Sequence, residues 1–339
     1  MKFKIMTWNV ENFFPVGVGA GPKTQAEFDA KLATLVRVIH SQDPDVVALQ
    51  EVGDQGHALP RPLTDLVKKL GGTYHTEVSV HPDGRGIRVA LLVRNTLKIE
   101  PQTEITKLDT APPLKFQALD GTTLTEMGRG AVHARVNVAT KRVHIITAHL
   151  KSKLLEFPGN KFTTKDEDLR VRVAAAALAR RCAEAAALRM RVTTLRKNTP
   201  NETVILLGDL NDGPAAATTE MLYGPSGSQP DVGQPGTGFD KPDEGDAQRL
   251  FNVTGLIPPD RRYSRIFQGK KELIDHILVS VNMVPQKDPN HKVHPQVDSL
   301  VDYGAQGAAG GLPSVSEDPH ERQGKPASDH APVVATFDI

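Results

Sequence analysis

The sequence predicts an α/β protein, because strand-like and helix-like segments alternate along the chain. Short apolar runs rich in β-branched residues recur from residue 3 to residue 337. Two longer segments, residues 24–43 and 166–198, instead repeat their apolar residues at helical spacing. In the middle of the chain, several strand-like runs are separated only by short turn signals, which favours antiparallel pairing. Mixed sheets accompanied by helices are therefore expected.

The first strand-like run covers residues 3–8 and delivers Asn9 and Glu11 at its end. The next run, residues 46–49, is entirely apolar and is followed closely by Glu51. A wholly apolar run of this length predicts a buried strand. Together with the intervening helix, these runs predict a strand, helix, strand unit that ends at Glu51.

The intervening helix has both a start and a stop signal. Thr24 and Glu27 form a candidate capping box, and apolar residues follow at helical spacing. Asp43-Pro44 ends the pattern, because the residue before a proline is disfavoured in helical conformation.

The middle of the chain predicts an antiparallel set of strands. The expected strands are residues 73–80, 87–94, 97–105, 131–138 and 142–148.

A long helix is expected from Asp166 to about Asn198. Its predicted buried face consists of Val171, Leu178, Cys182, Ala185, Leu188, Val192 and Leu195. Its many arginines lie elsewhere on the helix and are expected to form a solvated face. Later strands are expected at residues 204–207, 274–281 and 333–337, and two stretches rich in Gly and Pro, 213–245 and 285–327, are expected to be long surface loops.

Composition is typical of a folded soluble protein. Hydrophobic residues make up 39% and charged residues 24% of the 339 residues. We expect one domain over residues 1–339, with elaborations near 154–200, 213–245 and 285–327. The net charge of +1 argues against nucleic-acid binding by bulk attraction alone, and the single Cys182 leaves no disulfide framework or cysteine-based zinc site.

No secretory signal pattern and no apolar run of membrane-spanning length is visible in this sequence. A cytoplasmic protein without an obligate protein partner is the expectation, and secretion stays open if a leader was trimmed.

Six polar clusters stand at or near the ends of strand-like runs, so distant residues are expected to meet at one edge of a sheet. They are Thr7-Trp8-Asn9-Val10-Glu11-Asn12, Leu49-Gln50-Glu51-Val52, His149-Leu150-Lys151-Ser152-Lys153, Gly208-Asp209-Leu210-Asn211-Asp212, Ile274-Asp275-His276 and Ser328-Asp329-His330. Hydrolysis of a phosphate ester needs a positioned water, neutralisation of charge and help for the leaving oxygen. The clusters contain side chains for each of these tasks.

Carboxylates in these clusters are candidate ligands for a hard cation such as Mg²⁺. Glu51 is the principal candidate, with Asn9 and Glu11 beside it and Asp329 as a further one. Asp209 and Asn211, two apart on a segment expected to be extended, would share a face.

The histidines His149 and His330 are candidates for proton transfer or charge stabilisation. Asp275 is the natural partner for one of them. Three basic residues leave two interpretations open: Arg129 is either a turn residue or a phosphate contact, and Lys151 and Lys153 are either solvated or phosphate-binding.

Each signal is weak alone, but their joint order resembles the endonuclease/exonuclease/phosphatase superfamily, whose members include deoxyribonuclease I-like and exonuclease III-like enzymes. The resemblance covers residues 3–338 and rests on Asn-Val-Glu, Leu-Gln-Glu, Gly-Asp-Leu-Asn, Ile-Asp-His, Ser-Asp-His and the histidine at a strand end. It implies a four-layer α/β/β/α sandwich, in which two packed mixed β-sheets are flanked by helices.

The resemblance also implies roles for individual residues. Glu51 would bind Mg²⁺ or Mn²⁺ with support from Asn9, and Asp329 would assist on the metal side. Asp209 would position or activate the water, and Asn211 would bind the scissile phosphate. His149 and His330 would stabilise the phosphoryl group or move protons, with Asp275 orienting a histidine.

Three functions are considered. The first is a metal-dependent nuclease for DNA or RNA, for which Arg85, Arg88, Arg129, Lys151 and Lys153 would line a phosphate-tracking edge. The second is a phosphatase or phosphodiesterase for a phosphorylated small molecule or lipid headgroup, favoured by an aromatic content of only 5%. The third is a non-catalytic binding module, which the presence of every catalytic group disfavours.

Overall fold

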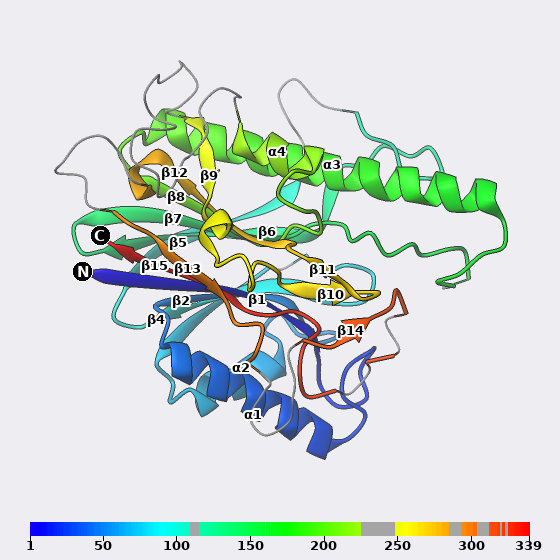
Figure 1. Ribbon diagram of the computed structural model, residues 1–339, viewed down its shortest axis with the longest axis horizontal. Helices are drawn as coiled ribbons and strands as arrows, with labels where there is room; N and C mark the ends of the chain where they lie inside the picture. The colour runs from blue at the N-terminus through cyan, green and yellow to red at the C-terminus, as the bar shows by residue number, and fades with distance from the viewer. Residues whose placement is uncertain are drawn as a thin grey trace.

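The computed structural model describes residues 1–79, 81–108, 115–159, 161–224, 248–284, 293–303, 312–318, 321–322 and 325–339. Within these residues the chain forms four layers: a helical layer, two packed β-sheets and a second helical layer (Figure 1). This is the predicted sandwich of mixed sheets between helices. None of the described helices combines the length and hydrophobicity needed to span a bilayer.

The first sheet contains six strands in the order β13-β15-β1-β2-β4-β3. Its strands are β1 (Lys2–Phe13), β2 (Val46–Gly53), β3 (Tyr74–Val78), β4 (Ile87–Arg94), β13 (Gln296–Ser299) and β15 (Val333–Asp338). β1 and β2 run parallel because α1 (Gln25–Gln42) connects them, and the other neighbours are antiparallel. α1 and α2 (Arg61–Lys69) cover its outer face (Figure 1).

The second sheet has the order β5-β6-β7-β8-β12-β9. Its strands are β5 (Lys98–Lys107), β6 (Glu126–Val138), β7 (Lys141–His149), β8 (Thr203–Asp209), β9 (Leu250–Asn252) and β12 (Asp275–Ser280). α3 (Glu167–Asn198) connects the parallel strands β7 and β8, and it covers the outer face together with α4 (Ala217–Tyr223) (Figure 1).

Smaller elements complete the described structure. A short sheet joins β10 (Arg265–Phe267), β11 (Lys270–Glu272) and β14 (Ser314–Val315), and two 3₁₀ turns, η2 (Val253–Leu256) and η3 (Val281–Met283), flank β12. The short sheet lies at the end of the sandwich opposite the chain termini (Figure 1).

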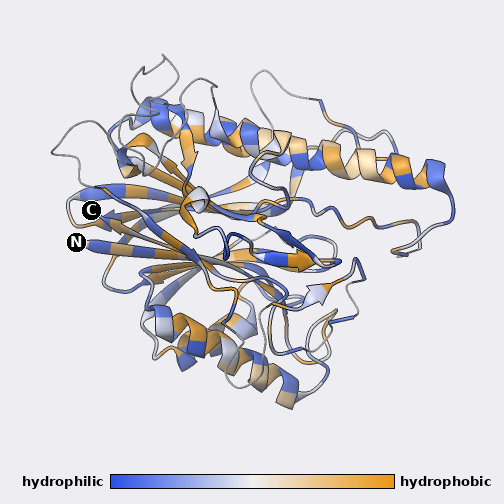
Figure 2. Cartoon of the chain, viewed as in Figure 1, coloured by the Kyte–Doolittle hydropathy of each residue, from blue (hydrophilic) through white to orange (hydrophobic). Residues whose placement is uncertain are grey.

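Three apolar clusters hold the layers together. The largest lies between the two sheets and includes Phe3, Ile5, Leu91, Ile145 and Ile277, all fully buried. The other two fill the space between each sheet and its helices. Figure 2 shows hydrophobic bands along the strands of both sheets, while the helices carry both hydrophobic and hydrophilic bands. Strands buried on both faces are nearly continuous apolar runs, which is why they were recognisable in the sequence.

The expected elements correspond closely to the observed ones. The capping box of α1 is confirmed, because the Thr24 hydroxyl accepts from the Glu27 amide at 3.2 Å and the Glu27 carboxylate accepts from the Thr24 amide at 3.2 Å. The run 87–94 coincides with β4, and β6 begins five residues earlier than expected, at Glu126.

The face predicted for the long helix is wrong in its N-terminal half. Val171 and Leu178 are 51% and 48% exposed. The buried residues there are Val173, Ala177 and Arg181 instead. The prediction of solvated arginines is also wrong for Arg181, whose guanidinium lies 2.7 Å from the Asp212 carboxylate in the interior. A run of alanines carries little periodic signal, so the apolar pattern could not identify the buried side.

The two expected loops contain regular structure. α4 lies in the stretch 213–245, and β13 and β14 lie in 285–327. These elements are short and interrupted, so their apolar residues are too few to show a period. Residues 225–247, 285–292, 304–311, 319–320 and 323–324 of these stretches lie outside the described residues.

Candidate active site

The second sheet places three polar residues side by side at one end of its central strands. His149 ends β7 and Asp209 ends β8, and the two are register partners in the parallel pair. β12 runs antiparallel to β8, so its first residue, Asp275, is also a register partner of Asp209. Gly208 permits the close approach of β7 and β8, because a Cβ there would lie 1.9 Å from the Ala148 carbonyl oxygen.

The first sheet contributes Asn9 and Glu51 through an irregularity in its pairing. β2 pairs with β4 through Gln50 and Val52, and the register skips Glu51, which has a left-handed φ of 62°. Such a bulge leaves one residue unpaired and redirects its side chain. Glu51 is thereby turned toward the end of the second sheet.

Asn9 connects the two sheets. Its amide nitrogen donates to the Asp209 carboxylate at 3.0 Å and to the Glu51 carboxylate at 3.4 Å. Its amide oxygen accepts from the Glu11 backbone amide at 2.9 Å, which fixes the orientation of the side chain. The two carboxylates are thus held on either side of one amide group.

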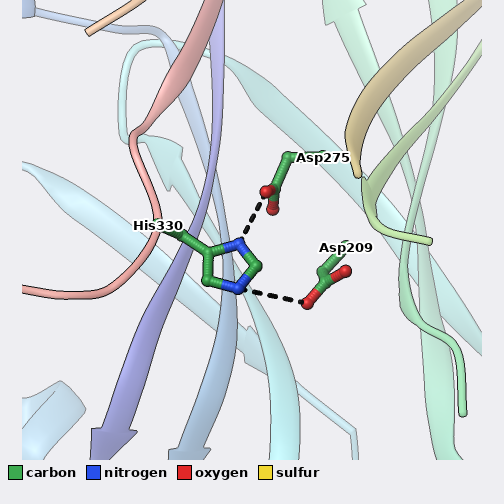
Figure 3. A group of neighbouring side chains, drawn as sticks. All are labelled: Asp209, Asp275 and His330. Carbon is green, nitrogen blue, oxygen red and sulfur yellow. Dashed lines mark hydrogen bonds and ion pairs between the residues drawn. The ribbon is translucent and has the colours of Figure 1, made fainter. Parts of the chain in front are cut away.

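His330 and Asp275 form a buried pair (Figure 3). The His330 Nδ1 atom lies 2.6 Å from the Asp275 carboxylate, and its Nε2 atom faces Asp209 at 3.9 Å. Burial alone would lower the pKa of His330, but Asp275, Asp329 and Asp209 outweigh it and raise that pKa to about 10. His330 is therefore an imidazolium at neutral pH. The Trp8 indole donates to the His330 carbonyl oxygen at 3.0 Å and holds this segment against β1.

Asp209 is the central carboxylate of the site. It lies 3.3 Å from His149 Nε2 and is almost fully buried. Burial raises its pKa, but His149, His330 and the Asn9 amide outweigh this effect and hold the pKa well below the usual range. For Glu51, burial likewise opposes ionisation, and His149, Arg85 and Arg129 together lower the pKa. Both carboxylates are ionised at neutral pH.

Asn211 reaches the pocket through a turn and not along the expected extended segment. Its φ is 55°, and its backbone amide donates to the Asp209 carboxylate at 2.9 Å. Its side chain donates to the Leu150 carbonyl oxygen at 2.9 Å. Asp209 and Asn211 still share the pocket, while Leu210 is buried between them.

The segment after His149 is anchored by α3. Glu184 accepts from the backbone amides of Lys151 at 2.7 Å and Gly128 at 2.9 Å. Arg181 donates to the Lys151 carbonyl oxygen at 3.0 Å and pairs with Asp212. These two residues could not be identified as site residues from the sequence, because charged side chains on a long helix are usually solvated.

Arg129 lies in the pocket wall with its guanidinium buried. It pairs with Asp83 at 3.0 Å and donates to the Leu150 carbonyl oxygen at 3.3 Å. Arg85 also lines the pocket, whereas Arg88 does not: it is 8% exposed and donates to the Ser79 carbonyl oxygen. The expectation that Arg88 belongs to a phosphate-tracking edge is wrong, because it lies within β4 on a buried face.

Glu11 and Asp329 lie at the same pocket but are each paired with an arginine. Glu11 lies 3.2 Å from Arg322 and accepts from the Asp329 backbone amide at 3.0 Å. Asp329 lies 3.5 Å from Arg265. Burial and the Asp329 carboxylate raise the pKa of Glu11 to about 8, against the opposing effect of Lys31 and Arg322. Neither arginine was identified from the sequence.

The pocket between these residues is open and has an empty volume of about 930 Å³. The residues predicted from the sequence that line it are Asn9, Glu11, Glu51, Arg85, Arg129, His149, Lys153, Asp209, Asn211, Asp329 and His330. Lys153 also lies 3.3 Å from the Asp212 carboxylate. Lys151 does not line it and lies in an adjoining cavity. Asp275 lies behind His330, fully buried.

The oxygen ligands suit a hard divalent cation. Glu51 presents an ionised carboxylate to the pocket, and the Asp209 carboxylate lies across the Asn9 amide from it. Asp209, Asp275 and His330 also offer ligand atoms within 4.8 Å of one another (Figure 3). In that group, however, His330 is cationic and hydrogen-bonded to Asp275, so neither of its nitrogens offers a lone pair to a metal, which favours Glu51 as the ligand. Carboxylate oxygen is the ligand type that Mg²⁺ and Mn²⁺ prefer.

Solved structures with similar folds cover nearly the whole chain. TDP2 from Caenorhabditis elegans superposes with a TM-score of 0.56 at 16% identity, covering 100% of this chain and 75% of that one. A humanized D. rerio TDP2 gives 0.55 at 15% identity, covering 100% and 99%. The human Nocturnin catalytic domain, solved with a bound sulfate anion, gives 0.55 at 15% identity, covering 99% and 94%. By sequence, none of the curated proteins matches the chain.

The match to a family model spans the site as well as the fold. It runs from residue 6 to residue 330, and so begins within β1 and ends at the pocket histidine. With the sandwich fold and the clustered carboxylates and imidazoles, this match shows that the chain belongs to the Endonuclease/Exonuclease/phosphatase family.

Proposed function

We propose that this protein is a divalent-metal-dependent nuclease that hydrolyses phosphodiester bonds in DNA or RNA by direct attack of an activated water. The observation that carries the proposal is the arrangement around Asp209. This buried, ionised carboxylate contacts His149 and Asn9 and faces the His330 imidazolium. Such a site combines a water-orienting group with cationic groups for the phosphoryl oxygens.

Glu51 holds the metal ion in this proposal, and the bound ion supplies neutralisation of charge on the phosphate. Glu11 and Asp329, the other candidate ligands, are paired with Arg322 and Arg265, so they are less available for a cation.

The water is oriented by Asp209, whose carboxylate can accept its hydrogen bond. Because the pKa of Asp209 is held low, the carboxylate orients the water more than it takes up a proton. Asn9 keeps this carboxylate aimed at the pocket.

The phosphoryl oxygens are stabilised by His330, with its proton on Nε2 and its ring fixed by Asp275. His149, Asn211 and Arg129 complete the wall around the scissile phosphate. All these groups are positioned by strand ends and turns, so little reorganisation is needed for catalysis.

A nucleic-acid substrate is favoured by the arginines of the wall and by the structural relatives. Arg85 and Arg129 flank the pocket and offer planar donors suited to phosphate. D. rerio TDP2, which superposes with a TM-score of 0.52, has been crystallised with a single-strand DNA product.

A second candidate is a phosphatase or phosphodiesterase for a phosphorylated small molecule or lipid headgroup. In the described part of the pocket wall, Phe267 is the one Phe, Tyr or Trp side chain that could stack on a base. The net charge of +1 likewise offers little attraction for a long polyanion.

Purified protein should be incubated with plasmid DNA, single-stranded DNA and RNA oligonucleotides, with Mg²⁺, with Mn²⁺ and with chelator. Asp209→Asn, which keeps the shape of the side chain, is the matched control against a contaminating nuclease. Metal-dependent cleavage by the wild type alone is expected. If no nucleic acid is cleaved while phosphate is released from nucleotides or inositol phosphates, the second candidate replaces the first.

A further inference from the structure

Lys151 lies in a second cavity next to the proposed active site. This open cavity has an empty volume of about 1370 Å³ and shares Arg85, Arg129 and His149 with the catalytic pocket. Lys151 lines the second cavity and not the first. A group bound at Lys151 is therefore adjacent to the scissile phosphate but distinct from it.

Lys151 feels the negative charge of Glu184 and Glu156 only from beyond ion-pair distance. Its ammonium group donates to the Leu154 carbonyl oxygen at 3.1 Å and to the Ser152 hydroxyl at 3.4 Å, both neutral oxygens. Among the residues that the structure describes, no carboxylate lies within ion-pair distance of it.

The buried carboxylates of this cavity are already engaged. Asp83 pairs with Arg129 at 3.0 Å and with Arg85 at 3.7 Å. Glu184 accepts from two backbone amides and pairs with Arg180 at 3.3 Å. Burial, followed by Arg129 and Arg85, lowers the pKa of Lys151 to about 8, against the opposing effect of Glu184 and Glu156. A half-buried cation beside two arginines is suited to an anion brought by the substrate.

Beyond Lys151 the surface becomes apolar. A third cavity shares Lys151, Glu156 and Arg180 with the second, and its other walls include Leu119 and Phe157. Lys151 and Arg180 are therefore the last basic residues before the apolar wall begins.

We propose that the second cavity is a subsite for one further phosphate group of the substrate, and that Lys151 is its principal contact, with Arg85 and Arg129 shared between the two phosphates. The inference rests on the proposed function and narrows the substrate to a phosphodiester that carries a second phosphate close to the scissile one. That phosphate belongs either to the next linkage of a polynucleotide or to the terminal monoester of a small bisphosphorylated molecule.

Two matched chromogenic substrates isolate the subsite. Thymidine 5′-(p-nitrophenyl phosphate) has only the scissile phosphate, and its 3′-phosphorylated derivative has one more. In both, water attacks phosphorus, the bond to the nitrophenyl oxygen breaks, and p-nitrophenolate leaves. The wild type should show a KM about tenfold lower for the 3′-phosphorylated ester, the scale of one charge-assisted hydrogen bond.

Lys151→Gln should abolish this preference while changing kcat/KM for the single-phosphate ester less than about twofold. Lys165→Gln, which removes an exposed lysine from the same connection between β7 and α3, is the matched control and should keep the preference. An equal loss on both esters would overturn the proposal, because Lys151 would then act on the scissile phosphate or on folding. Retention of the preference in Lys151→Gln would overturn it as well.

Two further arms separate the remaining alternatives. Comparison of a pentathymidylate with the dinucleotide bearing a terminal phosphate identifies the source of the second phosphate. If the internal linkage lowers KM and the effect depends on Lys151, the substrate is a polynucleotide. If only the terminal monoester lowers KM, the substrate is a small molecule. If neither ester is hydrolysed, the proposed function fails, and the subsite is tested by calorimetry with thymidine 3′,5′-bisphosphate and thymidine 5′-monophosphate. Tighter binding of the bisphosphate, lost in Lys151→Gln, would support the subsite, and equal binding would refute it.

Discussion

Glu184 is distant in sequence from every proposed catalytic residue, yet its replacement by Gln should impair catalysis. Its two carboxylate oxygens accept from the Lys151 amide at 2.7 Å and the Gly128 amide at 2.9 Å. In Glu184→Gln, the remaining side-chain oxygen can accept from only one of these two backbone amides. The new NH₂ group faces the other amide, so one charged hydrogen bond is lost and two donors lie against each other. Hydrogen bonds to charged groups contribute about 1.5–3 kcal/mol, and we expect a loss of about 2 kcal/mol in unfolding free energy.

The effect on turnover follows from the neighbouring peptide. The Leu150 carbonyl oxygen accepts from the side chains of Asn211 at 2.9 Å and Arg129 at 3.3 Å, so a shift of the Leu150-Lys151 peptide moves both. Misplacement of catalytic groups by about 1 Å costs on the order of a hundredfold in rate. We expect kcat to fall about tenfold to a hundredfold, with KM changed less than about threefold.

Steady-state hydrolysis of bis-p-nitrophenyl phosphate, with urea unfolding of the same preparations, measures both effects. Glu167→Gln is the matched control, because it makes the same change on the same helix at an exposed carboxylate that pairs with Arg170. If Glu184→Gln kept the kcat of the Glu167→Gln control while remaining folded, α3 would not position the site, and the reasoning would be refuted.

Three further outcomes are expected. Glu51→Gln should lower turnover roughly a hundredfold or more and shift the Mg²⁺ titration to higher concentration; an unchanged titration would remove Glu51 as the ligand. Asp275→Asn should lower the pKa of His330, because Asp275 is the largest of the groups that raise it, and the basic limb of the pH–rate profile should move to lower pH. Burial lowers the pKa of His276 from 6.5 to about 4. The unfolded chain therefore binds a proton at this histidine at a higher pH than the folded chain does, so the fold should be fully stable above pH 6.5 and lose stability as the pH falls toward 4. At 1.36 kcal/mol per pKa unit the loss reaches about 3 kcal/mol, so urea unfolding should show a stability advantage over His276→Asn at pH 7 that shrinks by pH 4.

The layers of the fold could be predicted because its central strands are buried on both faces. Runs such as residues 46–49 and 204–207 are apolar without interruption, and α1 has a complete capping box and a proline after its end. Short elements could not be recognised: β10, β11 and β14 have two or three residues each. β10 and β11 form a short hairpin, and β14 pairs with β10 from far along the chain. Nothing local in a strand of this length distinguishes it from a loop.

The clustering of the site residues could be predicted from their positions after strands. The arginines that pair with two of these residues could not. Asp275 and His330 stand at or beside strand ends, and the topology alone brings them together. Arg322 and Arg265, which pair with Glu11 and Asp329, lie in short or irregular segments with no pattern. An ion pair between residues far apart in sequence leaves no local signal.

The backbone at the site shows why these residue types were needed. Glu11, Asn12 and Asn211 adopt left-handed φ values of 49°, 53° and 55°, which cost on the order of 1 kcal/mol or more for residues other than glycine. Each is compensated in the same way, since its backbone amide donates to the side chain of a proposed site residue. Glu11 donates to Asn9 at 2.9 Å, Asn12 to Glu51 at 3.0 Å, and Asn211 to Asp209 at 2.9 Å.

The polar groups proposed to bind metal and orient water therefore also hold the turns that aim them into the pocket. This double role decides how substitutions there must be interpreted. Asp209→Ala removes both the water-orienting oxygen and the acceptor for the Asn211 amide, so lost activity could reflect a relaxed turn. Asp209→Asn can keep one acceptor oxygen for the Asn211 amide, while it removes the charge and places an NH₂ group toward the Asn9 amide nitrogen. A rate defect in Asp209→Asn without a loss of stability would assign the effect to chemistry, whereas a defect confined to Asp209→Ala would assign it to the turn.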